Sequence, residues 1–528
     1  MGPDVTSDSE NTCASGTEKK AEPAAPGFGR RWALRAAFMT TGSAYVSYAG
    51  GIIGTALLAR HLGPQDYGVY AYFVWLCGVL VKLYTAGFGN TAIRFVSEMV
   101  GQAQVGQAQG VIHWVHRKYV AGSLLVTALF VFVAPLLKLS SERALSMSLL
   151  ALAVTGSLAK AYFTLLAAFG KGYGRFEVEA ATTSFVAVVN VIGVAALVVF
   201  HVPLLGCAVF FVFLCFMHVV VARKLLASTG ILGLRGSLSE GVRARLGPHL
   251  RWSVVLALLA AVSGNSIETF LLNREVGPSA VAFFALALAF VSAGLNLVLV
   301  GASATLLPVL GHAYGREAER GVVRIAGRAL GYFQFLGVLI AGVGYFLAFP
   351  AVDLFYGERF LEAVWVLQAL VVGRGLAVGA GALTAFFVAN ERQRGRTGIL
   401  AVTLLFNVAV AVMLVPRYGL AGAVVSSVVT AFADLGIMAV VAVRGFGFEM
   451  PWGVLARLCL GGLIAAGLAW QVVGDGGHVV RGIVGASVFA FAYAALTVLL
   501  GAWDKEDIVA MRKLGVRIGG RVLGWRSR

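Results

Sequence analysis

Long apolar runs separated by short polar breaks occupy most of this chain. Because an α-helix rises 1.5 Å per residue, roughly 20 apolar residues suffice to cross the ~30 Å hydrocarbon layer of a membrane. With clusters of proline, glycine and charged residues taken as breaks, the pattern predicts an all-α polytopic membrane protein with about fourteen transmembrane helices. These helices are expected at residues 33–59, 67–92, 114–137, 143–169, 178–200, 204–226, 249–273, 281–309, 326–349, 361–388, 397–416, 420–443, 452–473 and 479–502.

The composition changes how the charge of the chain is interpreted. Of the 528 residues, 59% are hydrophobic and 13% are charged, and the mean hydropathy is +0.85. Such a chain is too apolar for a water-soluble protein, so the net charge of +17 does not indicate a nucleic-acid partner. The five cysteines form no paired framework, because four lie in apolar stretches and Cys13 lies in a polar segment.

The distribution of basic residues predicts the orientation. With both termini placed in the cytoplasm, that side carries 32 of the 42 Lys and Arg residues. The opposite face carries seven, namely Arg60, Lys138, Arg143, Arg274, Arg359, Arg417 and Arg481. The positive-inside rule then favours a multi-pass membrane protein with both termini in the cytoplasm, whose basic face contacts anionic inner-leaflet lipids. The connections are short, so any function must lie within the helix bundle.

Sliding the chain along itself by 214 positions reveals an internal repeat. Residues 57–64 (LLARHLGP) fall on residues 271–278 (LLNREVGP), and a slightly larger shift brings Asn190 onto Asn407. Six predicted spans separate equivalent helices, so the two lobes share one orientation and are related by an axis along the membrane normal. The predicted organisation is a disordered cytoplasmic tail (1–28), an N-lobe of helices 1–6 (29–228), a C-lobe of helices 7–12 (229–445), helices 13–14 (446–503) and a basic cytoplasmic tail (504–528).

Five ionisable residues fall well inside predicted spans, namely Lys82, Lys160, Glu268, Arg374 and Asp434. A charge at the bilayer centre costs about 2.5–3.5 kcal/mol on insertion scales, so each needs a water-filled cavity or a partner. Arg374 falls on Lys160 in the repeat, and equivalent positions would face one another across the pseudo-axis. We therefore predict a central water-filled cavity in which Lys82, Lys160 and Arg374 bind an anionic headgroup. The planar guanidinium of Arg374 would bind it in a forked geometry, and the lysines would act as point charges.

A structural role is the alternative for the same charges. Lys160 could pair with Asp434, and Arg374 with Glu268. Glu268 and Asp434 are also candidates for proton or sodium coupling, because burial favours the protonated form of a carboxyl group. An interfacial or salt-bridged Glu268 is the simpler interpretation.

The sequence predicts no catalytic constellation, cofactor or metal site. His113 and His116 are three residues apart, but no cysteine or acidic cluster completes a set of ligands. The glycine-rich stretch 170–174 follows a predicted transmembrane helix rather than a strand, so it is expected to be a turn and not a nucleotide loop.

Residues 57–70 (LLARHLGPQDYGVY), followed by residues 87–89 (GFG) and 94–98 (RFVSE), resemble the signature after the first helix of bacterial polysaccharide-biosynthesis flippases. These proteins belong to the multidrug/oligosaccharidyl-lipid/polysaccharide exporter superfamily. The resemblance covers about residues 33–445. It implies a V-shaped bundle of fourteen or twelve helices that flips undecaprenyl-pyrophosphate-linked sugars between leaflets by alternating access. By resemblance to the lipid II flippases, helices 13 and 14 would flank a groove for the lipid tail.

The leading functional hypothesis is a flippase, not an enzyme, for a lipid-linked oligosaccharide, working beside a glycan polymerase or glycosyltransferases. The polyprenyl tail can stay in lipid while the polar pyrophosphate-sugar head passes through a cation-lined cavity. A cation-coupled multidrug or metabolite exporter is the alternative within the superfamily. A membrane-embedded polymerase or ligase usually needs a sizeable outer-face domain, which the short outer loops do not provide. A scaffold for glycan-assembly enzymes is a further alternative.

Overall fold

The computed structural model describes residues 30–137, 145–231, 236–263, 266–389, 393–472 and 477–503, in which every regular element is a helix. The predicted tails, 1–28 and 504–528, lie outside these ranges. The elements are α1 (Arg30–Thr85), α2 (Phe88–Gly101), α3 (Val105–Leu136), α4 (Met147–Gly172), α5 (Glu177–Val199), α6 (Leu204–Ser228), α7 (Glu240–Val262), α8 (Ser266–Glu275), α9 (Pro278–Tyr356), the 3-10 helix η1 (Glu358–Phe360), α10 (Ala363–Leu376), α11 (Ala380–Ala389), α12 (Gln393–Phe446), α13 (Trp452–Val472) and α14 (His478–Leu499). The predicted all-helical fold class is confirmed.

Ten of the described helical segments are long and apolar enough to cross a membrane, or eleven when the bent pair α10–α11 is taken as one span. Thr41–Thr85 and Thr397–Phe446 are 45 and 50 residues long, and each contains one glycine with non-helical backbone angles, Gly63 and Gly419. Helix α9 has 79 residues and holds two candidate spans. The protein is thus a multi-pass membrane protein, and the number fourteen stays a prediction.

Three helices that the sequence predicts as continuous are interrupted. The helix expected at 67–92 breaks between α1 and α2 at Gly87, which has a φ of +80°. A Cβ atom at Gly87 would lie 2.6 Å from Ser253 of α7, so glycine is required both by the backbone and by this close approach. The helix expected at 249–273 is interrupted between α7 and α8, and the one expected at 361–388 bends by 42° between α10 and α11. The hydrophobic pattern did not predict these breaks, because the small residues at a break are no more polar than the helical residues on either side.

Two connections implied by the predicted spans, 93–113 and 227–248, contain helix that the sequence did not predict. Helix α2 continues to Gly101, α3 begins at Val105, and α7 begins at Glu240. Glu98 and Arg245 therefore stand on helices that extend beyond the apolar spans, where they contact each other.

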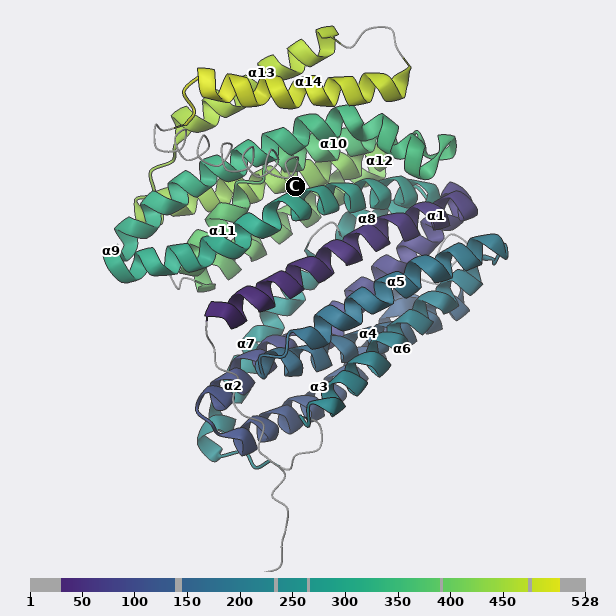
Figure 1. Ribbon diagram of the computed structural model, residues 1–528. Helices are drawn as coiled ribbons and strands as arrows, with labels where there is room; N and C mark the ends of the chain where they lie inside the picture. Colours follow the sequence, from purple (N-terminus) through teal and green to yellow (C-terminus); the bar gives the residue numbers. More distant parts are fainter. Residues whose placement is uncertain are drawn as a thin grey trace, which may run out of the picture.

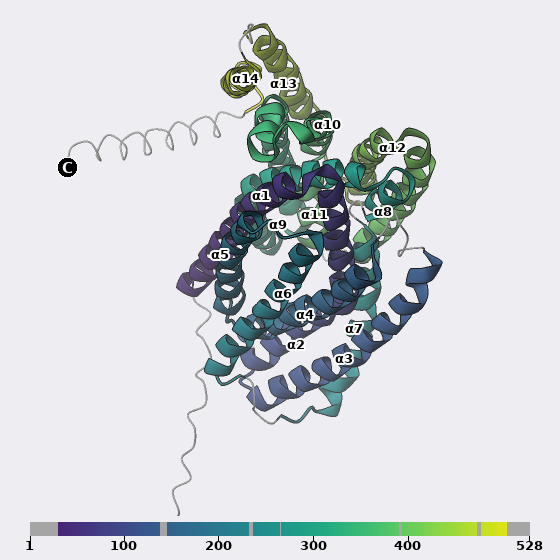
Figure 2. The ribbon, with the colours of Figure 1, turned by 90° about the vertical axis from the view of Figure 1, so that its right-hand side faces the viewer.

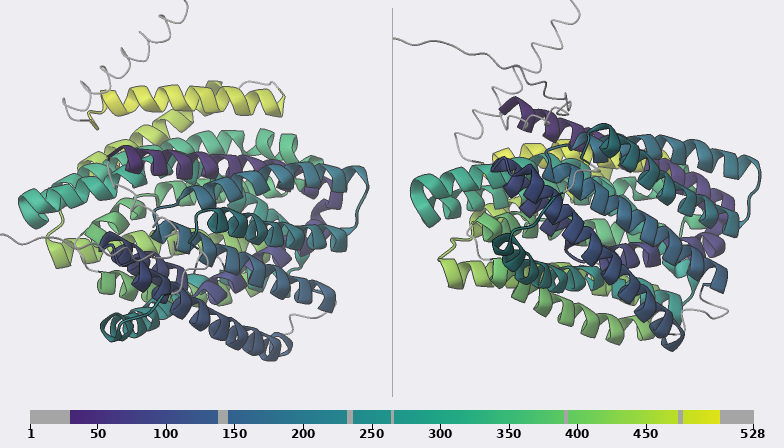
Figure 3. Two further views of the ribbon diagram at one scale, coloured as in Figure 1. Left: turned by 60° about the horizontal axis from the view of Figure 1, so that its bottom comes forward. Right: turned by 90° about the horizontal axis from the view of Figure 1, so that it is seen from below.

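The helices run side by side in a broadly common direction (Figure 3). Helices α2–α6 form one group, α9–α12 form another, and α1 lies between them against α9 (Figure 1). Helices α13 and α14 lie at one edge (Figure 2), where Phe489 and Tyr493 of α14 pack with Val338 of α9. The predicted lobe boundaries, 29–228, 229–445 and 446–503, stay predictions.

Candidate functional site

A cavity of about 400 Å³, here called the Lys160 cavity, lies among helices α1, α4, α5 and α6. The ammonium of Lys160 on α4 lies 2.8 Å from Nε2 of His218 on α6. Nδ1 of His218 lies 2.8 Å from the carbonyl oxygen of Leu214, so Nδ1–H donates there and Nε2 accepts from the lysine. The cavity also has polar walls, formed by Ser47, Thr55, Tyr70, Thr183, Asn190 and Cys215. No carboxylate is among the residues that line it, so its formal charge is positive.

A second cavity, of about 200 Å³ and here called the Arg374 cavity, lies between α10 and α12. Arg374 of α10 donates a hydrogen bond to Oγ of Ser427 at 3.1 Å. Asp434 also lines the cavity, and its Oδ1 accepts a hydrogen bond from Thr403 at 3.2 Å. This cavity therefore contains charges of both signs, in contrast to the Lys160 cavity.

Glu268 on α8 is fully buried, with 0% of its surface exposed. Its Oε1 accepts hydrogen bonds from Nδ2 of Asn407 at 2.6 Å and from Oγ of Ser426 at 2.9 Å. Glu268 Oε2 and Asn407 Oδ1 are buried, and neither has a hydrogen-bond partner among the described residues. With these two oxygens unpartnered, the carboxyl group can bind a proton or a small hard cation. The pairing of Glu268 with Arg374 that the sequence suggested stays a prediction.

Equivalent residues of the repeat line the two cavities. Asn190 and Lys160 line the first, and their counterparts Asn407 and Arg374 line the second. The sequence led us to expect that Lys160 and Arg374 would face one another across the pseudo-axis. They line separate cavities instead. In a repeat, a side chain that points into its own lobe has an equivalent that points into the other lobe, so the two side chains do not meet. Lys160 and Asp434 also line different cavities, which separates the other pair considered from the sequence.

Lys82 lines neither cavity. It stands in the last turn of α1, just before the break at Gly87, and its side chain is exposed. Within the described ranges, its ammonium has no hydrogen-bond or ion-pair partner. Its counterpart in the repeat, Asn296 on α9, is exposed as well. Lys82 therefore has the accessibility that a ligand contact requires and lacks the buried partner that a structural role would need.

Helices α1 and α9 are in close contact at the predicted outer end of the molecule. Arg60 donates to the carbonyl oxygen of Leu354 at 2.6 Å, and the Thr55 and Tyr356 hydroxyls lie 3.4 Å apart. A Cβ atom at Gly68 would lie only 1.9 Å from the carbonyl oxygen of Pro278. Helix α1 is therefore packed tightly against α9 at this end.

Helices α2 and α7 are joined at the predicted cytoplasmic end. Arg245 donates to both carboxylate oxygens of Glu98, at 2.7 and 2.9 Å, and Thr91 Oγ1 lies 3.2 Å from Nδ1 of His249. The hydrogen bond from Arg245 lowers the pKa of Glu98 below its ordinary value. Contacts of this kind therefore join α1 to α9 at one end of the molecule and α2 to α7 at the other.

The sequence analysis missed His218 as a partner of Lys160. A histidine in the middle of the apolar stretch 204–226 was a usable signal, but histidine counted as neutral and so did not appear among the buried charges. Nδ1 of His113 lies 2.8 Å from the Gln109 carbonyl oxygen. In the described part of the chain, no three His, Cys, Asp or Glu side chains gather as metal ligands would.

The fold is a bundle of helices long and apolar enough to span a membrane, and solved structures of transporters match it. The lipid II flippase MurJ, in its inward closed conformation, matches it with a TM-score of 0.70 at 14% identity, over 88% of this chain and 98% of that one. An inward-facing multidrug resistance MATE family transporter of the MOP superfamily gives 0.61 at 16% identity, over 79% and 98%. A MOP superfamily transporter from Pyrococcus furiosus gives 0.57 at 12% identity, over 79% and 96%. The chain therefore has the fold of the MOP-superfamily flippases and transporters.

The family follows from the sequence itself. The family model described as polysaccharide biosynthesis protein matches residues 33–313, which is more than half of the 528 residues. The chain belongs to this polysaccharide biosynthesis protein family, and the resemblance inferred from residues 57–70 is confirmed. No curated protein matches the chain.

Proposed function

We propose that this protein is a flippase that moves a polyprenyl-pyrophosphate-linked oligosaccharide from the inner to the outer leaflet by alternating access, for cell-surface polysaccharide synthesis. Membership of the polysaccharide biosynthesis family is the observation that carries this proposal. The fold supports it, because a structure described as a lipid II flippase has the same architecture. A charged, sugar-bearing head cannot cross hydrocarbon unaided, whereas two lobes that open alternately give it a polar route.

The proposed setting is the bacterial plasma membrane, with both termini in the cytoplasm. The 32-to-7 distribution of Lys and Arg between the two faces supports this orientation. Anionic inner-leaflet lipids would contact the basic face, and a glycan polymerase or glycosyltransferases would supply or consume the lipid-linked glycan.

Lys82, Lys160 and Arg374 are the proposed contacts of the anionic head. Lys82 has an exposed ammonium beside a helix break, where a phosphate can reach it without displacing a protein partner. Lys160 stands in a cavity with no carboxylate in its lining, so that cavity attracts anions. Arg374 offers a planar fork that matches phosphate geometry. Because Lys160 and Arg374 lie in separate cavities, we propose that they act at different stages of the crossing, each within its own lobe.

Glu268 and Asp434 are the proposed coupling residues. Binding of a proton or a cation at Glu268 would change the charge next to Asn407 and Ser426 of α12. That change would alter how α8 packs on α12 and thereby bias one conformation of the transporter. Asp434 would contribute through the Arg374 cavity, which it lines together with Arg374.

A cation-coupled multidrug or metabolite exporter is the second candidate. It is favoured by the buried Glu268 with its spare oxygen, together with the likeness to multidrug MATE transporters. The two candidates differ in which residue is indispensable. An exporter would need Glu268 but not Lys82, whereas the flippase needs the cations that contact the head.

Deleting the gene tests the proposed function. A flippase of this kind should leave a lipid-linked glycan accumulated on the cytosolic leaflet, out of reach of an impermeant glycan-oxidising reagent in intact cells. Complementation with the wild-type gene should return the glycan to the outer surface. Unchanged glycan distribution, combined with sensitivity to toxic cations, would reject the flippase in favour of the exporter.

A further inference from the structure

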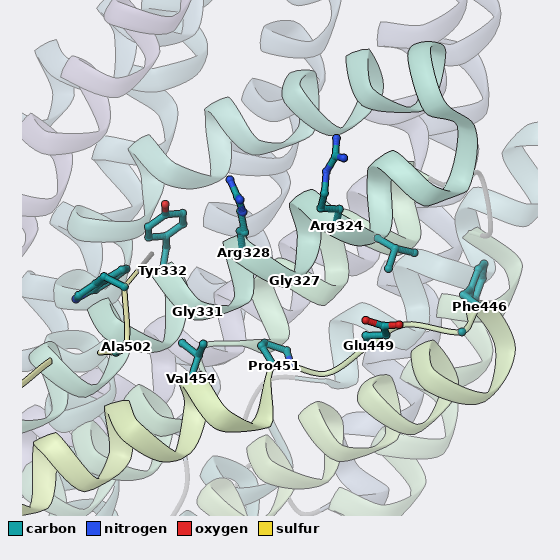
Figure 4. Close-up of a pocket in the computed structure, with 13 residues that line it drawn as sticks. Arg324, Gly327, Arg328, Gly331, Tyr332, Phe446, Glu449, Pro451, Val454 and Ala502 are labelled. Carbon is teal, nitrogen blue, oxygen red and sulfur yellow. The ribbon is translucent and has the colours of Figure 1, made fainter. Parts of the chain in front are cut away.

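A cavity of about 610 Å³, here called the Arg324 pocket, lies where α9, the linker between α12 and α13, and the end of α14 meet. Figure 4 shows the side chains that line it. It shares no lining residue with the Lys160 and Arg374 cavities, so it is a separate site.

The position of the pocket along the helices places it at a membrane surface. One candidate span begins at Gly321 and another at Trp452, while two others end at Phe446 and Leu499. All four of these ends lie close to the pocket in sequence, and the predicted orientation puts them on the cytoplasmic side. Trp503 stacks on Tyr332 with ring centroids 5.5 Å apart, and aromatic side chains of this kind are enriched at membrane–water interfaces.

The charges of the pocket are arranged on its two sides. Arg324 and Arg328 are four residues apart and therefore project from one face of α9. Glu449, on the linker after α12, lies on the opposite side of Gly327 from the two arginines (Figure 4). Among the residues that the structure describes, the formally charged ones of the lining are two arginines and one glutamate, whose formal charges sum to +1.

Glycines keep the space between these charges open. Gly327 and Gly331 lie on the same face of α9 as the arginines. A Cβ atom at Gly327 would meet no atom closer than the Glu449 carbonyl oxygen at 3.9 Å, and one at Gly331 would meet Val454 at 3.4 Å. A small side chain would therefore fit at either position. The glycines leave room for a ligand and are not needed to avoid a clash.

We propose that the Arg324 pocket binds the headgroup of a mono-anionic phospholipid that carries hydroxyl groups, as phosphatidylglycerol does. The phosphate lies between Arg324 and Arg328, because guanidinium groups bind phosphate oxygens in a forked geometry. The headgroup hydroxyls donate to the Glu449 carboxylate. The acyl chains leave along the apolar start of α13, where Val454 lines the pocket and Trp452 is 68% exposed.

Net charge distinguishes this headgroup from the two zwitterionic ones, and hydrogen bonding distinguishes it further from choline. A net charge of −1 matches the +1 of the lining, whereas ethanolamine and choline headgroups are neutral overall. A choline headgroup also has no donor for Glu449. The aromatic and apolar walls formed by Tyr332, Trp503 and Val454 favour a lipid over free phosphate, which has no apolar part to bury.

Lipid retention by the full-length protein tests the proposal. The detergent-purified protein is incubated with equimolar phosphatidylglycerol, phosphatidylethanolamine and phosphatidylcholine, and bound lipid is counted by native mass spectrometry. Phosphatidylglycerol should be retained at least about tenfold over phosphatidylcholine, a ratio that corresponds to about 1.4 kcal/mol. The double variant R324Q/R328Q should lose this preference. The matched control R223Q/R243Q removes the same charge from exposed arginines of α6 and α7 and should keep it.

Two further variants separate the pocket from general surface charge. G327L fills the space without changing any charge, so it should also abolish the preference for phosphatidylglycerol. E449Q keeps an acceptor oxygen but removes the negative charge and so raises the lining charge, so it should favour dianionic phosphatidic acid over phosphatidylglycerol. Elution volume on gel filtration verifies that each variant is folded.

Several results would overturn the proposal. Equal retention of the three lipids, equal losses in R223Q/R243Q and R324Q/R328Q, or full retention by G327L would each do so. Displacement of phosphatidylglycerol by millimolar inorganic phosphate would identify a soluble phosphate as the ligand instead. None of these measurements depends on transport, so their outcome is independent of the proposed flippase function.

Discussion

The ammonium of Lys160 lies 2.8 Å from Nε2 of His218, and this contact joins α4 to α6 within the membrane-spanning bundle. Because the Nδ1 proton of His218 is held by the Leu214 carbonyl oxygen, Nε2 is the atom that accepts from the lysine. A protonated His218 would place two positive charges at this distance, with no carboxylate in the cavity lining to offset them. This contact between the two groups therefore requires a neutral histidine beside the charged lysine.

The first prediction concerns His218→Ala. Removing Nε2 leaves the Lys160 ammonium without this acceptor, and a buried donor left unsatisfied costs about 1–3 kcal/mol or more. Thermal unfolding of the purified protein in detergent should therefore occur at a lower temperature. His113→Ala is the matched control, because Nδ1 of His113 makes the same 2.8 Å bond to a carbonyl four residues earlier, but its ring is exposed. Equal losses in the two variants would show that the lysine contact contributes nothing.

The all-helical architecture followed from the apolar runs, and the buried charges Lys160 and Arg374 were visible as exceptions within them. Their direction was not predictable, because a helix that is apolar on all sides has no polar face that tells which way a residue points. The hydrogen-bond partners of Glu268 could not be predicted from the sequence for another reason. Asn407 and Ser426 are 139 and 158 residues away in the chain, and periodicity carries no information about such distant contacts.

The second prediction concerns Lys82→Ala. If the exposed ammonium binds the anionic head, export of the glycan should be lost while the amount of protein in the membrane stays near normal, because no described contact depends on this side chain. Lys82→Arg keeps the charge and should retain part of the export. Lys118→Ala removes an exposed charge from α3 and serves as the control, with export unchanged. Full export by the Lys82→Ala variant would remove Lys82 from the proposed site.

The third prediction concerns Glu268→Gln. This change keeps the size of the side chain and an oxygen that can accept from Asn407 and Ser426, but it removes the charge that would hold a proton or cation. Transport should fall at least about tenfold, which corresponds to about 1.4 kcal/mol, and should lose its dependence on the coupling ion. Glu275→Gln, at the exposed end of α8, should transport normally. A fully active Glu268→Gln variant with unchanged ion dependence would exclude coupling through this carboxyl group.

The fourth prediction concerns the pH dependence of the contact between α2 and α7. Because Arg245 lowers the pKa of Glu98, the ionised carboxylate stabilises this contact. The stabilisation is fully present above the ordinary pKa of glutamate, about 4.3, and is lost as the pH falls through the lowered pKa. Spin labels at Gly101 of α2 and Gly241 of α7, both exposed and without close neighbours, should therefore report a longer or broader distance in acid.

Charge reversal separates this ion pair from other effects of acid on the same contact. Glu98→Arg places two guanidinium groups together, so the distance between the two labels should be long even at neutral pH. Exchanging the charges, with Glu98→Arg and Arg245→Glu combined, should restore the short distance because the pair forms in the opposite sense. The Thr91–His249 contact is intact in both variants and would keep the distance short in Glu98→Arg if it were the dominant link. A short distance in Glu98→Arg at neutral pH would therefore assign the contact to His249, whose protonation would then explain any opening in acid.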